Sequence, residues 1–129
     1  CIRDRPLEEK YGDWWNLLFM IGLAYKNMGE MDKAKEYYEK ILRMKPQQVD
    51  TLVELALCEA SSLNMNRAIE LLEAAAKLKE DPEILCNLGM AYLNVGNFDD
   101  ANYYIERAYE LNPEDEVTVA CKRELAKYI

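Results

Sequence analysis

Small residues recur along this chain at an almost constant interval, and this recurrence constrains the fold more than any other feature. Gly22, Ala56 and Gly89 are separated by 34 and then 33 residues. A second set of small residues repeats the same two intervals: Ala34, Ala68 and Ala101. A period of this length indicates that one supersecondary unit is repeated three times and stacked on itself.

The spacing inside each unit predicts two helices joined by a tight turn. In the first unit Leu18, Ile21 and Tyr25 lie three to four residues apart, so they share one face of a helix. Gly22 removes the side chain where a second helix must approach closely. We expect Ala34 to have the same role on that second helix.

The residues between the helices predict where one helix ends and the next begins. Gly29 and Gly96 follow the first helices of units one and three, where glycine readily adopts the left-handed conformation. We expect each second helix to be N-capped by a polar residue two positions before its small residue: Asp32, Asn66 and Asp99. An apolar residue precedes each expected cap, as in a hydrophobic staple: Met31, Met65 and Phe98.

This pattern resembles the tetratricopeptide repeat (TPR). The third unit matches the family at eight signature positions: Leu85, Leu88, Gly89, Tyr92, Ala101, Ile105, Ala108 and Pro113. The first unit departs mainly at Ile41, and the second has Glu59 and Leu63 where the family prefers Tyr and Gly. The resemblance implies an all-α fold, a right-handed α-α superhelix of helix-turn-helix repeats.

The same resemblance divides the chain into five parts. They are a lead segment over 1–14, repeats over 15–48, 49–81 and 82–115, and a C-terminal capping helix over 116–129. Lys122 and Arg123 stand where a fourth repeat would have Leu and Gly, which favours a cap over a further repeat. We expect the inner face of that helix to contain Val117, Cys121, Leu125 and Tyr128.

Composition excludes several classes of function. The 129 residues contain 16 Lys and Arg against 24 Asp and Glu, a formal net charge of −8. This balance disfavours nucleic-acid and anionic-membrane surfaces, which need a basic footprint. The chain has no His, which removes imidazole-based catalysis and the common zinc sites. Without a phosphate loop or an activated nucleophile, we expect no catalytic residues, no metal and no cofactor.

The cysteines and the apolar runs predict the cellular compartment of the protein. The four cysteines are widely spaced and form no C-x-x-C pair: Cys1, Cys58, Cys86 and Cys121. This usage favours reduced thiols and a cytoplasmic setting. No apolar run approaches the roughly 18 to 20 residues that span a bilayer, and no secretory signal is visible. Because the chain begins at Cys1, we expect a fragment or a processed start, with an acylated lipoprotein as the alternative.

The resemblance to the TPR family implies a concave groove that is lined by the first helix of each repeat. Such a groove binds a peptide or a partner helix. The matching positions of the first repeat are Asn16, Phe19, Met20, Leu23, Lys26 and Asn27. Those of the second repeat are Asp50, Val53, Glu54, Leu57 and Ser61. Those of the third repeat are Glu83, Cys86, Asn87, Met90 and Asn94.

The best-known ligand mode of the family, a basic clamp for an acidic C-terminus, does not fit these residues. The matching positions are Phe19, Leu23, Glu54, Glu83 and Asn87, none of which is basic. A ligand carboxylate beside two glutamates would be repelled. An apolar or amphipathic segment that carries Lys or Arg is therefore the expected partner.

Other hypotheses compete with this prediction. The groove is alternatively covered by residues of the chain itself, such as 1–14. The chain is alternatively the accessory TPR region of a larger enzyme such as a glycosyltransferase. A third hypothesis is homo-oligomerisation through the edge that contains Trp14 and Trp15.

Overall fold

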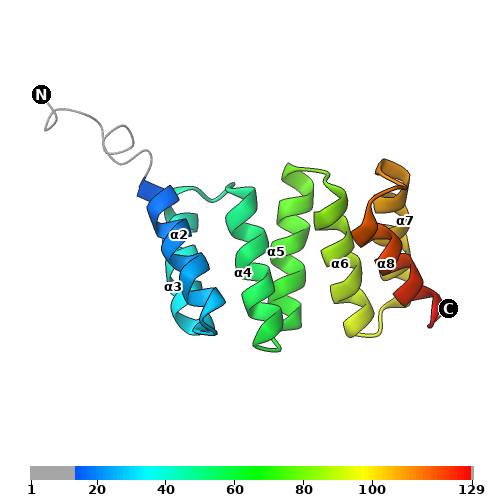
Figure 1. The fold of residues 1–129 in the computed structure, drawn as a ribbon, viewed down its shortest axis with the longest axis horizontal. Helices are drawn as coiled ribbons and strands as arrows, with labels where there is room; N and C mark the ends of the chain where they lie inside the picture. The colour runs from blue at the N-terminus through cyan, green and yellow to red at the C-terminus, as the bar shows by residue number, and fades with distance from the viewer. Residues whose placement is uncertain (1–13, 129) are drawn as a thin grey trace, which may run out of the picture.

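The computed structural model describes residues 14–128, which form seven α-helices (Figure 1). They are α2 (Trp14–Asn27), α3 (Met31–Met44), α4 (Val49–Ser61), α5 (Met65–Leu78), α6 (Pro82–Asn94), α7 (Phe98–Leu111) and α8 (Glu116–Ala126). Three hairpins follow one another along the molecule, and α8 lies against the last of them. This confirms the predicted all-α repeat superhelix. The lead segment, apart from Trp14, lies outside the described residues.

The small residues lie where the two helices of a hairpin meet. A Cβ atom added to Gly22 would lie 2.6 Å from Cε1 of Tyr38 on α3. A Cβ atom added to Gly89 would lie 2.5 Å from Cγ1 of Ile105 on α7. The recurring interval in the sequence therefore corresponds to a recurring point of close helix contact.

The hydrophobic core continues from each hairpin into the next. Leu55 and Cys58 of α4 pack in one cluster with Ile41 and other residues of α3. Ile84 and Leu88 of α6 pack in a second cluster with residues of α4 and α5. Each second helix is thus covered on its far side by the hairpin that follows it, as expected for a stacked array.

The turns within the hairpins place one residue in the left-handed region. Gly29 has φ +82° and Gly96 has φ +80°, which confirms the predicted helix ends. The second hairpin has Leu63 at the corresponding turn, with φ +66°. A non-glycine residue in this conformation costs about 1–2 kcal/mol, so the second turn is the strained one.

We expect Leu63→Gly to raise the free energy of unfolding by about 0.5–1 kcal/mol. Leu63 is 85% exposed, so little packing is lost, and glycine relieves the strain at a modest entropic cost. Urea unfolding measures the change. Leu63→Ala is the control, because it removes the same side chain but keeps a Cβ atom. A glycine variant no more stable than the alanine variant would contradict this account.

The predicted N-caps of the second helices are wrong by two residues. The helices begin at Met31, Met65 and Phe98, which were expected to precede the caps. The actual N-caps are Glu30, Asn64 and Asn97. Of these three, only Asn97 makes a side-chain capping bond, which its oxygen accepts from the backbone N–H of Asp100 at 3.3 Å.

The inner face of α8 also differs in part from the prediction. Cys121 and Leu125 are buried as expected, but Val117 and Tyr128 are exposed and Thr118 is fully buried instead. The cause is the N-cap, since Asp115 accepts hydrogen bonds from the backbone N–H and the hydroxyl of Thr118 at 2.9 and 2.8 Å. This cap turns Thr118 toward the core.

Candidate partner-binding surface

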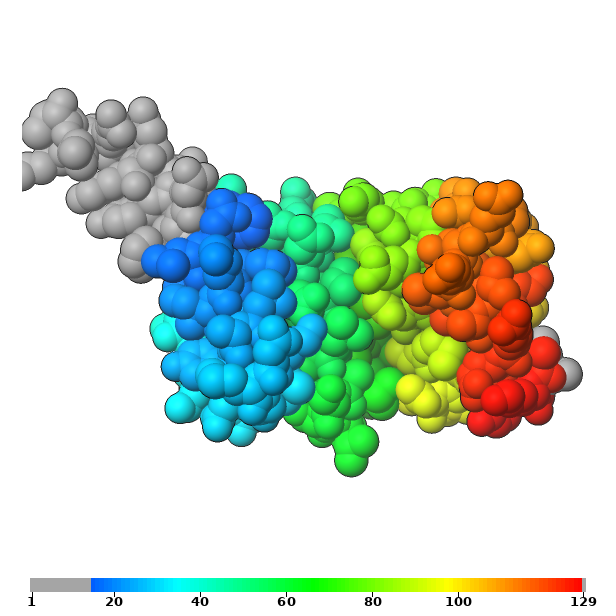
Figure 2. All heavy atoms as spheres, viewed as in Figure 1, coloured from blue at the N-terminus to red at the C-terminus, as the bar shows by residue number. Residues whose placement is uncertain are grey.

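The predicted groove residues lie on α2, α4 and α6, the first helices of the three hairpins. Contacts between their side chains show that neighbouring first helices are adjacent: α2 reaches α4 through Lys26 and Glu54, and α6 reaches α8 through Cys86 and Thr118. In the view of Figures 1 and 2, α2 lies in front of α3 and α8 in front of α7. We name the surface formed by the predicted residues of α2, α4 and α6 the first-helix face.

The apolar part of the first-helix face is built around methionine and leucine. Met20 is 67% exposed, and Leu23, Leu57 and Met90 are half-buried. Val53 is almost fully covered by the core cluster around it. The apolar strip that remains accessible to a partner therefore consists of Met20, Leu23, Leu57 and Met90.

Asparagine side chains dominate the uncharged polar part of this face. Asn16, Asn27, Ser61 and Asn94 are exposed, and Asn87 is half-buried. Amides and hydroxyls of this kind can donate and accept hydrogen bonds with the backbone of a bound segment.

The charges of this face are arranged asymmetrically. Lys26 and Glu54 form an ion pair between α2 and α4, with 26% and 21% of their side chains exposed. Asp50 and Glu83 are exposed and form no ion pair within the part of the chain that the structure describes. Because Glu54 neutralises Lys26, the net charge left on this face is negative.

Besides Val53, two further predicted groove residues are not available to a partner in the expected way. Cys86 is fully buried, and its thiol donates a hydrogen bond to the hydroxyl of Thr118 on α8 at 3.3 Å. Phe19 is half-buried between Trp15 and Tyr38, with ring centroids 6.3 and 5.8 Å away. Cys86 therefore belongs to the junction with α8, and Phe19 helps to hold the first hairpin together.

An ion network around the buried carboxylate of Glu59 joins α3, α4 and α5, and the sequence did not predict it. The carboxylate of Glu59 is 2.9 Å from Nζ of Lys35 and 3.7 Å from Nε of Arg67. The hydrogen bond between Lys35 and Glu59 raises the pKa of Lys35 above its ordinary value. The available signal was an acidic residue at a position where the other two units have Tyr25 and Tyr92.

Metal-ligand grouping, the Cys58 thiol and helix hydrophobicity are three further properties of the described residues. Within residues 14–128 no three His, Cys, Asp or Glu side chains are grouped so as to hold a metal ion. Burial raises the pKa of the Cys58 thiol, which disfavours the reactive thiolate. None of the seven helices combines the length and hydrophobicity that crossing a bilayer requires.

Sequence comparisons agree with this architecture. Profiles described as "Tetratricopeptide repeat" match residues 16–48 and 82–115, together about half of the chain. Photosystem I assembly protein Ycf3 of Prochlorococcus marinus (strain NATL2A) is 29% identical over 121 residues, which cover 85% of this chain and 69% of that protein. BBSome complex member BBS4 of Bos taurus is 28% identical over 116 residues, covering 89% of this chain and 22% of that protein.

Solved structures show the same fold. The chain resembles MamA with a TM-score of 0.75 and 28% identity, covering 79% of this chain but only 56% of the MamA chain. It resembles the first TPR of Spaghetti (RPAP3) bound to the HSP90 peptide SRMEEVD, with a TM-score of 0.81 and 19% identity over 88% of this chain and 90% of that one. It also resembles 19% of the O-GlcNAc transferase of Thermobaculum terrenum, with a TM-score of 0.72 and 21% identity over 78% of this chain.

The repeat interval, the close contacts at Gly22 and Gly89, and the profile matches all lead to the same assignment. The chain belongs to the tetratricopeptide repeat family and is a helical-repeat scaffold for interaction with proteins or peptides.

Proposed function

We propose that the first-helix face binds an apolar or amphipathic segment that carries Lys or Arg, and that the chain acts through this binding without catalysis. The proposal is supported by the accessible apolar strip of Met20, Leu23, Leu57 and Met90. It is also supported by Asp50 and Glu83 on the same face, which form no ion pair within residues 14–128. Flexible methionine side chains adapt to apolar partners. The neighbouring negative charge favours a basic rim on the partner and repels an acidic one.

The charge of this face argues against the ligand type seen in one structural neighbour. The RPAP3 domain is bound to the peptide SRMEEVD, which ends in acidic residues. In the present chain Lys26 is already paired with Glu54, and Glu83 is exposed one helical turn from Asn87. An acidic peptide would lose hydration here without gaining a free cation as a partner.

The alternative roles stay predictions. The likeness to the O-GlcNAc transferase is at 21% identity, so it supports the fold alone and not an enzyme-accessory role. The assembly role in the name of Ycf3 belongs to a protein that is 29% identical. A scaffold that holds an apolar, basic segment is compatible with assembly of a larger complex.

The test uses two amphipathic helical peptides with the same apolar stripe, one flanked by Lys and one by Glu. We expect the Lys peptide to bind at least about tenfold more tightly, a difference of about 1.4 kcal/mol. Met20→Lys combined with Met90→Lys should weaken that binding by about tenfold or more, because it places positive charge in the apolar strip. Fluorescence anisotropy of labelled peptides measures both effects.

Met28→Lys is the matched control, because Met28 is 65% exposed and follows the end of α2. It makes the same chemical change outside the first-helix face and should leave binding unchanged. Met20 and Met90 are also better targets than Phe19, whose contact with Tyr38 would couple binding to folding. Tighter binding of the Glu peptide, or equal binding by the double variant, would refute the proposal.

A further inference from the structure

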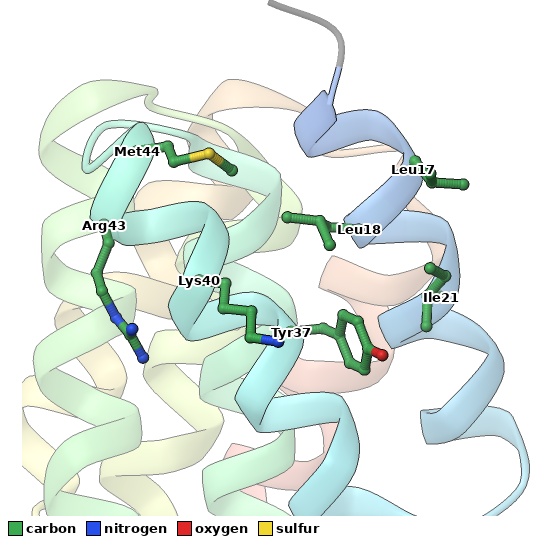
Figure 3. Close-up of a pocket in the computed structure, with 7 residues that line it drawn as sticks. All are labelled: Leu17, Leu18, Ile21, Tyr37, Lys40, Arg43 and Met44. Atoms are coloured by element: carbon green, nitrogen blue, oxygen red, sulfur yellow. The ribbon is translucent and has the colours of Figure 1, made fainter. Parts of the chain in front are cut away.

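The two ends of the array differ. At the C-terminal end α8 covers the last hairpin, and Lys122 of α8 pairs with Glu106 of α7 at 3.1 Å. At the other end α2 and α3 present an open hollow of about 550 Å³, lined by residues such as Leu17, Ile21 and Met44 (Figure 3). We name this end the leading face and define it by six residues: Leu17, Ile21, Tyr25, Lys33, Tyr37 and Lys40.

The side chains of the leading face point away from the rest of the array or across the hairpin. In Figure 3, Leu17 and Ile21 project outward from α2, whereas Tyr37 projects from α3 toward α2. Tyr37 stacks on Tyr25, with ring centroids 5.7 Å apart. The result is an apolar and aromatic surface with no helix of the described chain on it.

The repeat relates this surface to two junctions inside the array. Leu17 corresponds to Thr51 and Ile84, since the intervals are 34 and 33 residues. Leu17 is 47% exposed, whereas Thr51 is 0% and Ile84 is 5% exposed. At the internal junctions the second helix of the preceding hairpin provides the cover, with α3 on α4 and α5 on α6.

Ile21, the next apolar residue of the leading face, is likewise more exposed than its counterparts in the other repeats. Ile21 corresponds to Leu55 and Leu88, both fully buried, yet Ile21 itself is only half-buried. An end repeat normally carries polar residues on its outer surface. The leading face instead has apolar residues at the positions that a preceding helix covers at the internal junctions.

The polar groups of the internal junctions indicate the charge of that helix. Tyr92, which corresponds to Tyr25, donates a hydrogen bond to Glu73 of the preceding α5. Arg107, which corresponds to Lys40, pairs with Glu80 just beyond the same helix. Both carboxylates thus come from the preceding hairpin, seven residues apart.

Lys33, the other lysine of the leading face, also corresponds to a cation that pairs with a carboxylate of the preceding hairpin. Lys33 corresponds to Arg67, which pairs with Glu39 of the preceding α3 at 3.1 Å. At the leading face Lys33 lies 5.4 Å from the centroid of Tyr25 and Lys40 lies 4.9 Å from that of Tyr37. Neither ammonium forms an ion pair with a carboxylate of residues 14–128.

The geometry points to a second docking site: the leading face binds an acidic amphipathic helix of a partner protein, packed as α5 packs on α6. Its apolar stripe covers Leu17 and Ile21. Two of its carboxylates, seven residues apart, reach the hydroxyl of Tyr25 and the ammonium of Lys40. This site is separate from the first-helix face and does not depend on what that face binds.

A second copy of this chain fits the leading face poorly. Two leading faces placed together would bring Lys33 and Lys40 of both copies into one interface, and like charges repel. The opposite end of a second copy also fits the leading face poorly. At that end α8 already covers α7, and Glu106 is already paired with Lys122. The charge of the face thus favours a distinct acidic helix over the alternative hypothesis of self-association at the Trp14 and Trp15 edge.

The probe is a capped synthetic peptide with the sequence of residues 65–81, which contains Glu73 and Glu80 in their native spacing. Its binding to the full 129-residue chain is followed by fluorescence anisotropy. We expect Leu17→Asp to weaken binding by about tenfold or more, because it puts a charge in the apolar contact. Lys40→Glu should also weaken binding, and a peptide with Glu80→Lys should recover it.

Val95→Asp is the matched control, because Val95 is 46% exposed and follows the end of α6, outside both faces. It makes the same kind of change as Leu17→Asp and should leave binding of the acidic peptide unchanged. No binding at about 1 mM peptide would overturn the proposal, and so would equal binding by Leu17→Asp. Light scattering of the chain alone tests the second-copy alternative. A mass above 15.0 kDa that Leu17→Asp returns to the monomer value would assign the face to self-association and overturn the proposed partner.

Discussion

Lys35→Met combined with Arg67→Met is expected to lower the free energy of unfolding by about 3–5 kcal/mol. The carboxylate of Glu59 is buried, and these two cations are the groups that pair with it, at 2.9 and 3.7 Å. Methionine retains most of the aliphatic stem of Lys or Arg, so the main change is an unpaired buried charge. Urea unfolding monitored by circular dichroism gives the loss from the shift in midpoint at constant m-value.

Two further variants separate this effect from other causes. Glu39→Gln breaks the exposed pair between Glu39 and Arg67 and should cost less than about 1 kcal/mol. Adding Glu59→Leu to the double variant should recover most of the lost stability, because no buried charge remains. A double variant within about 1 kcal/mol of the parent chain would show that Glu59 is not held as a buried ion.

The network of Glu59 illustrates what the sequence could reveal and what it could not. The repeat period was readable because close helix contact at Gly22 and Gly89 admits only small residues there. The period also identified Glu59 as an exception to the family pattern. Its partners could not be read in the same way, because Lys35 and Arg67 reach it across helices whose relative positions are set by tertiary packing.

In the second and third hairpins the N-caps were misplaced because the sequence has two capping residues two positions apart. Asn64 and Asn66 are both good capping residues, as are Asn97 and Asp99. The turn decides between them. In the first hairpin the backbone N–H of Glu30 donates to Tyr25 at 2.8 Å and closes α2, so α3 begins at Met31 with no further non-helical residues.

The candidate surface was predictable only as a set of positions on the first helices. The TPR register placed Cys86 among the accessible residues, but it carries no information on how α8 packs. The bond between the Asp115 carboxylate and the backbone N–H of Thr118 sets the start of α8. Thr118 then covers Cys86, which removes one predicted contact residue from the surface.

Gly89→Ala is expected to lower the free energy of unfolding by about 2 kcal/mol, although alanine normally stabilises a helix interior by about 1 kcal/mol relative to glycine. The new Cβ atom would lie 2.5 Å from Cγ1 of Ile105 and 3.3 Å from the backbone oxygen of Ala101. Ile105 is fully buried and cannot swing aside, so α6 and α7 must separate. Overpacking of this kind costs about 1–3 kcal/mol, and urea unfolding measures it.

The matched control removes the clash from the other helix. Ile105→Ala alone should cost about 2–5 kcal/mol because it leaves a cavity. On that background Gly89→Ala should be neutral or stabilising, since the Cβ atom now enters empty space and helix propensity favours alanine. The two substitutions are therefore expected to couple by more than about 1 kcal/mol, as residues in contact do. The outcome against this account is an equal loss of stability from Gly89→Ala in the parent chain and in the Ile105→Ala background. In that case the recurring small residues do not serve to let the two helices approach closely.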